Sequence, residues 1–129
     1  MIYIMMLLLG CVAIFLRFKG IELINSAFVL PSGVNIGLLA VNITGSFLIG
    51  MAYVIKSKNP DISQWVSLVL MVGFLGAFTT YSSYSLELLK SFINRDYSLS
   101  VLSFLSHNAL GFLGCYMGYL LAQKFYPVV

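Results

Sequence analysis

Charged residues are scarce in this chain of 129 residues: Asp, Glu, Lys and Arg make up only 9%, while 60% of the residues are hydrophobic. The mean hydropathy is +1.00. A soluble domain covers its surface with about 25% charged residues. The scarcity of charge therefore excludes a water-soluble domain and predicts a protein solvated by lipid. The length suits one domain, residues 1–129.

Cysteines and clustered basic residues are also few. Cys11 and Cys115 both lie within apolar stretches, so neither a disulfide nor a metal site of cysteines is expected. The net charge is +3, but the basic residues are scattered and form no cluster that could follow a phosphate backbone. Nucleic acid is therefore not an expected partner. No carboxylate lies near His107 in the sequence to orient it, so an enzyme is not expected either.

Long uncharged runs are what the sequence does contain. Three of them, residues 23–55, 62–86 and 97–123, are 33, 25 and 27 residues long, whereas a membrane-spanning helix needs about 20. A fourth run, residues 1–16, ends at Arg17 and spans a bilayer only if its helix continues past the arginine. No Lys or Arg precedes this run, so a retained helix fits it better than the alternative of a signal peptide.

The runs predict an all-α membrane protein with four transmembrane helices, at about residues 2–24, 32–55, 63–93 and 98–125. Ser32 follows a proline and Ser63 follows Asn59-Pro60-Asp61, so both are candidate N-caps. Asn94-Arg95-Asp96 is a short polar turn. Small residues repeat every four positions in the second and fourth helices, as in Asn42, Ser46, Gly50 and in Gly114, Gly118, Ala122, which predicts close helix contacts.

Basic residues give no preferred orientation in the membrane. With four helices, both termini and the second loop share one side, which carries Lys56, Lys58 and Lys124, while the other side carries Arg17, Lys19, Lys90 and Arg95. Because basic residues favour the cytoplasmic side, three against four predicts insertion in both orientations. Two opposite copies could then pair about a two-fold axis in the membrane plane. The alternative is that other features of insertion fix a single orientation.

The third helix carries the most unusual segment. Two glycines and the adjacent threonines at 79 and 80 are poor helix formers, and they predict a break near Gly76–Thr80, close to the bilayer centre. Irregular backbone at this depth is tolerated only inside protein or beside a cavity, and its freed carbonyls need a partner, such as a cation. After the break, Tyr81 and Ser85 share one helix face with Tyr84 beside them.

Four other polar residues lie within the apolar runs, and each leaves two readings open. Asn42 costs free energy in lipid unless it is hydrogen-bonded, and its amide could serve either an anion or a neighbouring helix. Asn108 poses the same question, and His107 is either a satisfied polar residue or a ligand. Arg17 could extend its charge to the interface or raise the local concentration of anions at a vestibule.

The third-helix segment, Gly73-Phe-Leu-Gly-Ala-Phe-Thr-Thr-Tyr-Ser-Ser-Tyr-Ser-Leu-Glu87, resembles the hallmark motif of the Fluc (CrcB) family of fluoride channels. The second helix is similar to that family's Asn-and-Gly pattern in Val41-Asn-Ile-Thr-Gly-Ser-Phe-Leu-Ile-Gly50. The first-helix arginine of the family resembles Arg17 in Phe15-Leu-Arg-Phe18. Chain length and helix number agree too, so the resemblance covers nearly the whole chain.

The resemblance implies a passive channel that exports cytoplasmic fluoride across the inner (plasma) membrane of a prokaryote. It implies an antiparallel, dual-topology dimer in lipid, with two pores and a structural sodium ion at its centre. The main-chain carbonyls of Gly76 and Thr79 would hold the sodium, and Arg17 would lie at the vestibule. The implied fluoride-pore residues are Asn42, Tyr81, Ser82, Tyr84, Ser85, Phe104 and Asn108.

The chain departs from the family pattern at four positions. Tyr81 and Tyr84 replace the two pore phenylalanines, Leu38 replaces a threonine, and Phe104 replaces a tyrosine. These departures suggest an alternative, in which the chain is the partner subunit of a heterodimeric channel, with one pore conducting or none. A small proton-coupled multidrug exporter is a further alternative. It needs a carboxylate deep in the membrane, whereas Glu22 and Glu87 lie towards helix ends, which argues against it.

Overall fold

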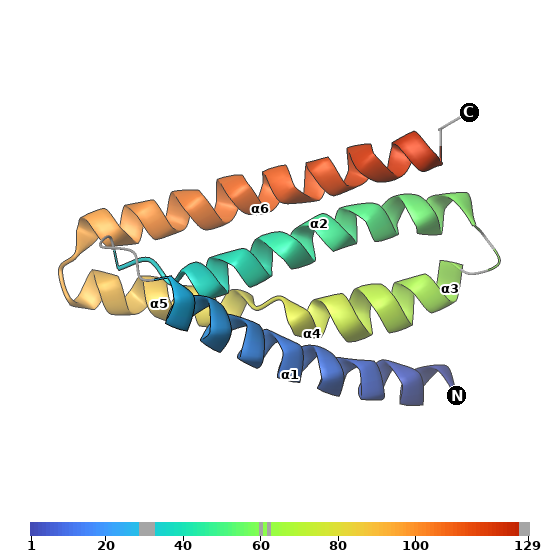
Figure 1. Ribbon diagram of the computed structural model, residues 1–129, viewed down its shortest axis with the longest axis horizontal. Helices are drawn as coiled ribbons and strands as arrows, with labels where there is room; N and C mark the ends of the chain where they lie inside the picture. Colours follow the sequence, from blue (N-terminus) through green and yellow to red (C-terminus); the bar gives the residue numbers. More distant parts are fainter. Residues whose placement is uncertain (29–32, 60, 62, 127–129) are drawn as a thin grey trace.

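Four helical spans lie side by side in the computed structural model, which describes residues 1–28, 33–59, 61 and 63–126 (Figure 1). The spans are α1 (Ile2–Ala27), α2 (Ile36–Lys58), a composite third span and α6 (Tyr97–Phe125). Each is long and apolar enough to cross a membrane. The N-terminus and the C-terminal end of α6 lie at the same end of the molecule. The predicted all-α fold with four transmembrane helices is therefore confirmed.

The ends of the first two helices differ from the prediction. α1 passes through Arg17 without interruption and ends at Ala27, three residues beyond the predicted end. α2 begins at Ile36 instead of residue 32, because the side chain of Asn35 accepts a hydrogen bond from the Leu38 N–H at 2.9 Å and so provides the N-cap. It continues to Lys58 instead of ending at residue 55. The candidate cap Ser32 lies outside the described residues.

The third span consists of several pieces, namely α3 (Ser63–Trp65), the π-helical η2 (Val66–Leu75), α4 (Gly76–Phe78) and α5 (Tyr81–Ile93). Ser63 is itself the first helical residue, so the cap position before it falls on residue 62, outside the described residues. Between α4 and α5 the backbone is extended, with ψ of 155° at Thr79 and φ of −146° at Thr80. Figure 1 shows this link near the middle of the span. The predicted break near Gly76–Thr80 is confirmed.

α2 and α6 pack against each other along their length, and glycines set how closely they approach. A Cβ atom on Gly50 would overlap the carbonyl of Cys115, and one on Gly118 would overlap the carbonyl of Phe47. A larger residue at either position would force the two backbones apart. The rows of small residues therefore mark the helix contact, as predicted.

A tight turn fixes α5 beside α6. Arg95 adopts a left-handed backbone with φ of 61°, and the N–H of Asp96 bonds back to the carbonyl of Ser91. The Asp96 side chain then caps α6 by accepting from the Leu99 N–H at 3.0 Å. The buried hydroxyls of Ser91 and Ser100 lie 2.8 Å apart and join the two helices. The predicted polar turn at residues 94–96 is confirmed, and it sets the register of α5 against α6.

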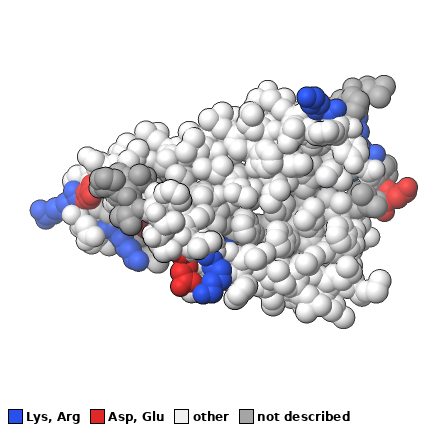
Figure 2. Space-filling model, viewed as in Figure 1, with Lys and Arg blue, Asp and Glu red and all other residues white. Residues whose placement is uncertain are grey.

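The outer surface is largely apolar. Figure 2 shows a face on which charged side chains gather near the two ends and in one patch at the lower edge, while most of the remaining surface is uncharged. Large hydrophobic side chains point outward on the spans, among them Phe15, Phe112 and Leu113, whereas soluble monomers rarely expose a continuous apolar surface of this kind. The fully buried side chains are few, and the largest are Leu38, Val69 and Leu75. A single chain thus leaves most of its large apolar side chains uncovered by its own packing.

Candidate functional site at the break in the third span

Asn42 of α2 pairs with the broken backbone. Its side-chain carbonyl accepts from the Thr80 N–H at 3.0 Å, and its amide nitrogen donates to the Thr80 carbonyl at 3.4 Å. The first of these bonds replaces the one that the Thr80 N–H loses at the break, because an unpaired backbone group is costly at membrane depth. Of the two readings left open for Asn42, the interhelical bond is therefore present, and one amide hydrogen of the side chain remains for a further acceptor.

The break also frees particular carbonyls. In a continuous helix the Thr80 N–H would bond to the carbonyl of Gly76, and the Ser83 N–H to that of Thr79. Here the Thr80 N–H bonds to Asn42, and the Ser83 N–H donates to the Thr80 hydroxyl at 3.3 Å, which caps α5. The carbonyls of Gly76 and Thr79 have therefore lost their usual helical donors. These two are the carbonyls that the family resemblance assigns to sodium.

Arg17 makes a contact that neither of its predicted roles included. Its Nη1 donates to the carbonyl of Ala77 at 3.0 Å, joining α1 to the last turn of α4. Arg17 is the sixteenth residue of α1, and ten more helical residues follow it. A guanidinium at a helix C-terminus is favoured by the helix dipole. The arginine therefore holds the end of α4 as well as bringing positive charge to the break.

A pocket of about 270 Å³, which we call the break pocket, lies where α2, α6 and the break meet. Four of the predicted pore residues line it, namely Asn42, Tyr81, Tyr84 and Asn108, and Thr79 of the predicted sodium site lines it as well. The N-terminus of α5 begins at this pocket, so its dipole favours an anion there. Hydrogen-bond donors and the positive end of a helix thus share one cavity.

Aromatic rings form one wall of the break pocket. The rings of Tyr81 and Tyr84 meet edge to face at 5.5 Å, and Tyr84 stacks on the imidazole of His107 at 4.6 Å. Asn108 donates from its amide to the Tyr84 hydroxyl at 3.2 Å and to the carbonyl of Phe104 at 2.7 Å. Tyr84 is buried, whereas the Tyr81 side chain is 78% exposed. Aromatic edges carry the positive side of the ring quadrupole and therefore attract anions.

The remaining predicted pore residues do not line this pocket. Ser85 and Phe104 line a separate apolar groove between α5 and α6, and the Ser82 hydroxyl lies 3.2 Å from that of Thr80. Leu38, where the family has a threonine, is almost fully buried in the core. Within one chain, the structure thus brings together only part of the predicted set.

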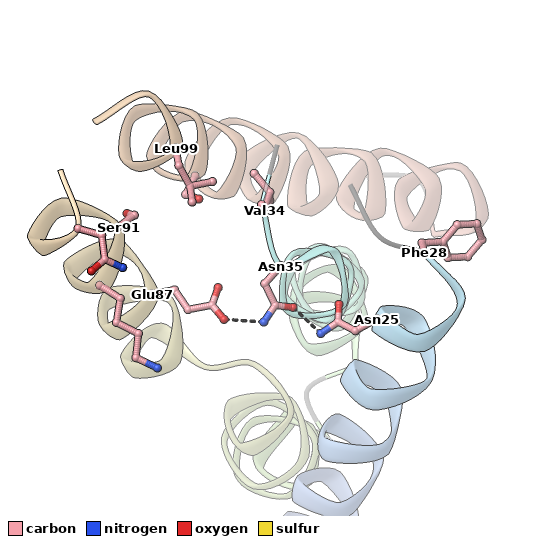
Figure 3. A pocket seen from close by; sticks show the side chains of 11 residues that line it. Asn25, Phe28, Val34, Asn35, Glu87, Ser91 and Leu99 are labelled. Carbon is pink, nitrogen blue, oxygen red and sulfur yellow. Dashed lines mark hydrogen bonds between the residues drawn. The ribbon is translucent and has the colours of Figure 1, made fainter. Parts of the chain in front are cut away.

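A second pocket of about 470 Å³ lies at the end of the molecule opposite the termini, and we call it the mouth pocket (Figure 3). Asn25 donates to the side-chain carbonyl of Asn35 at 2.9 Å, and Asn35 donates in turn to the carboxylate of Glu87. Figure 3 shows these three side chains in a row across the pocket. Lys90 also lines it, so the pocket contains one acidic and one basic side chain.

Sequence reasoning missed Asn25 and Asn35. Both are polar residues at helix ends, where an asparagine is common and draws little notice. Asn35 does carry an N-cap signal, because asparagine is favoured immediately before a helix. Weighed against Ser32, it would have given the correct start of α2.

Comparison with known proteins places the chain that carries this site in a protein family. Residues 4–119 match the model of the family described as "CrcB-like protein, Camphor Resistance (CrcB)". The chain belongs to the CrcB family. The predicted resemblance to this family is confirmed, and the match includes the whole break and every predicted site residue.

Curated relatives of the CrcB chain carry the name "Fluoride-specific ion channel FluC". The protein of Geobacter sulfurreducens is 35% identical over 116 residues, covering 89% of each chain. That of Acidobacterium capsulatum is 35% identical over 88 residues, covering 68% of this chain and 70% of its own. That of Francisella philomiragia is 43% identical over 76 residues, covering 56% and 58% respectively. The relatives are named as channels, in agreement with the prediction that the chain is not an enzyme.

Proposed function

We propose that this chain is a fluoride-selective ion channel, which lets fluoride leave the cytoplasm passively through pores in an antiparallel dimer. The observation that carries the proposal is the family match, because relatives named fluoride-specific channels align with the chain across the break and both of its flanking helices. Export requires the inner (plasma) membrane of the cell, and the four apolar spans suit a multi-pass protein there.

The break pocket has the chemistry that a small anion needs. Fluoride is strongly hydrated, so a pore must offer donors in place of water. The spare amide hydrogen of Asn42 and the N-terminus of α5 are such donors. The tyrosine ring edges add a weaker attraction. We assign the anion path to this pocket, with Ser82, Ser85 and Phe104 contributing from the outer face of the cleft between α5 and α6.

The freed carbonyls fit the sodium ion that the family resemblance implies. Carbonyl oxygens are hard ligands, and unwound backbone at membrane depth commonly coordinates such cations. Gly76 and Thr79 offer two oxygens per chain, and a second copy about a two-fold axis would double that number. When bound, the ion would supply fixed positive charge near both pores, which attracts anions in a low-dielectric setting.

The proposal of an antiparallel dimer rests on the balance of basic residues between the two sides of the membrane. Three basic residues on the side of the termini face four on the other side, so neither orientation is favoured. A single chain also leaves Tyr81 largely exposed beside the break pocket. A second, inverted copy would complete the walls of the pocket and bring the two breaks together.

The test is fluoride efflux from liposomes that contain the purified chain, followed with a fluoride electrode after a potassium ionophore is added. Rapid release of fluoride but not of chloride is the expected result. Release that requires an opposing proton gradient would instead support an exporter. Absence of release from any preparation that is folded and dimeric would refute a channel formed by this chain alone.

A heterodimer is the second candidate assembly, because four positions depart from the family pattern. Leu38 is buried, and the Tyr84 hydroxyl is held by Asn108 within the chain, so both substitutions are accommodated by this subunit's own packing. Co-reconstitution with a related chain from the same organism separates the assemblies. Fluoride release only from the mixed preparation would identify this chain as a partner subunit.

A further inference from the structure

The two polar pockets follow one another along the lengths of α5 and α6, each of which contributes residues to both. On α5, Tyr84 lines the break pocket and Glu87, three residues later, lines the mouth pocket. On α6, Ser103 lines the mouth pocket and His107, four residues later, lines the break pocket. Residues three or four apart are about one helical turn apart. The stack of Tyr84 on His107 therefore lies at the boundary between the pockets.

The hydrogen bonds of His107 identify its tautomer. Its Nδ1 lies 3.1 Å from the carbonyl of Ser103, and since a carbonyl can only accept, Nδ1 carries the proton. In the neutral ring, Nε2 is therefore a lone-pair acceptor. This Nε2 is buried and has no hydrogen-bond partner among the described residues. A buried acceptor without a donor is rare and calls for an explanation.

Protonation would change Nε2 from a hydrogen-bond acceptor into a donor. A lone pair repels an anion, whereas the N–H of a charged imidazolium donates to it and attracts it. Imidazole is the side chain whose charge ordinarily changes between about pH 5 and 8. A charged donor that is buried without a partner is also far less stable than a neutral acceptor in the same place. The charged ring must therefore leave its position in the stack or gain an anion.

We propose that the stack of Tyr84 on His107 closes the passage between the mouth pocket and the break pocket, and that protonation of His107 opens it to anions. This inference rests on the proposed channel function and adds to it a gate that opens at low pH. The ligand of the charged ring is a small anion, fluoride in the working channel.

Among the described residues that line the two pockets, the titratable groups other than His107 come from α5. Tyr84 and Tyr81 stand in the aromatic wall, and Glu87 and Lys90 line the mouth pocket beyond it. The residues that α2 and the break contribute to the break pocket, namely Asn42, Gly45, Ser46, Ile49, Leu75, Thr79 and Thr80, do not titrate in this range. Glu87 is the competing source of a pH response, so its variant E87Q is the matched control.

The first experiment measures fluoride current across planar bilayers, because leakage of neutral HF through lipid carries no current. The wild-type current is expected to rise several-fold as the pH falls from about 7.5 into the acid range below that of an exposed imidazole, because burial disfavours the charged ring. H107Q, which keeps a polar side chain but cannot titrate, should lose the rise, whereas E87Q should keep it. A rise of wild-type size in H107Q overturns the proposal.

The outcomes separate this inference from the function on which it rests. A wild-type current that does not change with pH overturns the gate and leaves the channel intact. No current at any pH, from the chain alone or together with a related chain, overturns both.

The second experiment needs no variant, because the chain has a single histidine. Nitrogen NMR of the labelled imidazole in the reconstituted protein reports its tautomer and charge. The ring is expected to be neutral and protonated on Nδ1 at about pH 8, and charged in the acid range in which the current rises. Fluoride, but not chloride, should then shift the Nε2 signal. A ring that stays neutral throughout, or that does not respond to fluoride, overturns the proposal.

Discussion

Backbone polar groups in a membrane must find their hydrogen bonds within the protein. Two regions of this chain meet that constraint in different ways: the contact between α2 and α6, and the break in the third span. Along α2 and α6 the backbone stays helical, and glycines let the two helices approach until one backbone touches the other. At the break the helix is given up, and side chains of α1 and α2 supply the missing hydrogen bonds. One region depends on shape and the other on polar pairing.

The difference indicates where each region is vulnerable. A packed contact fails when atoms are added, because rigid backbones cannot yield. A hydrogen-bonded break fails when atoms are removed, because the freed groups have no water to replace a lost partner. The same contrast separates stability from the proposed function, since the break forms the pocket to which we assign the anion path. The substitutions below test this contrast.

The largest effect is expected from G118A. Its new Cβ would overlap the carbonyl of Phe47, so α2 and α6 must separate, and we expect a loss of about 1–3 kcal/mol of stability. Gly111 on the same helix is the matched control, because a Cβ there would lie 3.8 Å from the Ser46 hydroxyl, an ordinary contact. Thermal unfolding in detergent measures both. Equal stability of G118A and G111A would show that the close approach carries no strain.

N42A should come next, with a greater effect on flux than on folding. It leaves the N–H of Thr80 unpaired, at about 1–3 kcal/mol for a buried group. Relaxation of the break would recover part of this cost while spoiling the pocket, so fluoride efflux should fall sharply. Ser46 lines the same pocket, and its hydroxyl makes no hydrogen bond among the described residues, so S46A is the control. Comparable efflux from N42A and S46A would contradict the bracing role of Asn42.

R17Q should have a smaller effect, because it removes one hydrogen bond to a single carbonyl. A bond from a charged donor is worth about 1.5–3 kcal/mol, and the loss is reduced where Gln can still reach Ala77. R17K keeps the charge and loses the planar fork of donors. If the contact matters, R17K should fall between wild type and R17Q in thermal unfolding. If only charge matters, R17K should match wild type in both unfolding and flux.

The sequence predicted the positions of the helices and of the break better than it predicted the contacts between them. Gaps between charged residues located four helices, and the poor helix formers at Thr79 and Thr80 located the break, since both are local properties. The bond from Arg17 to Ala77 joins residues 60 apart in the chain, and the pairing of Asn42 with Thr80 joins residues 38 apart. Such bonds depend on how helices rotate against each other, which a single sequence does not encode in any local pattern.

The same limit applies to the predicted pore. The positions of Ser85 and Phe104 on their helices were foreseeable, but their separation from Asn42 and Asn108 into another groove was not. That separation follows from the register of α5 against α6, fixed by the turn at Arg95 and the bond between Ser91 and Ser100. The turn itself was predicted at residues 94–96, but the left-handed backbone of Arg95 and the bond between Ser91 and Ser100 were not.

Y81F should have the smallest effect of the series and sharpens the comparison within the break pocket. The Tyr81 ring is 78% exposed in the single chain, and its hydroxyl has no hydrogen bond within the described parts of the structure. Stability should therefore change by no more than about 0.5 kcal/mol, and fluoride efflux should match that of wild type. Y84F is its matched partner, because the Tyr84 hydroxyl accepts from Asn108 and the ring is buried. If Y81F slowed efflux more than Y84F, the exposed hydroxyl would be a donor to the ion, and the ring edges alone would not explain how this channel uses tyrosine where its family has phenylalanine.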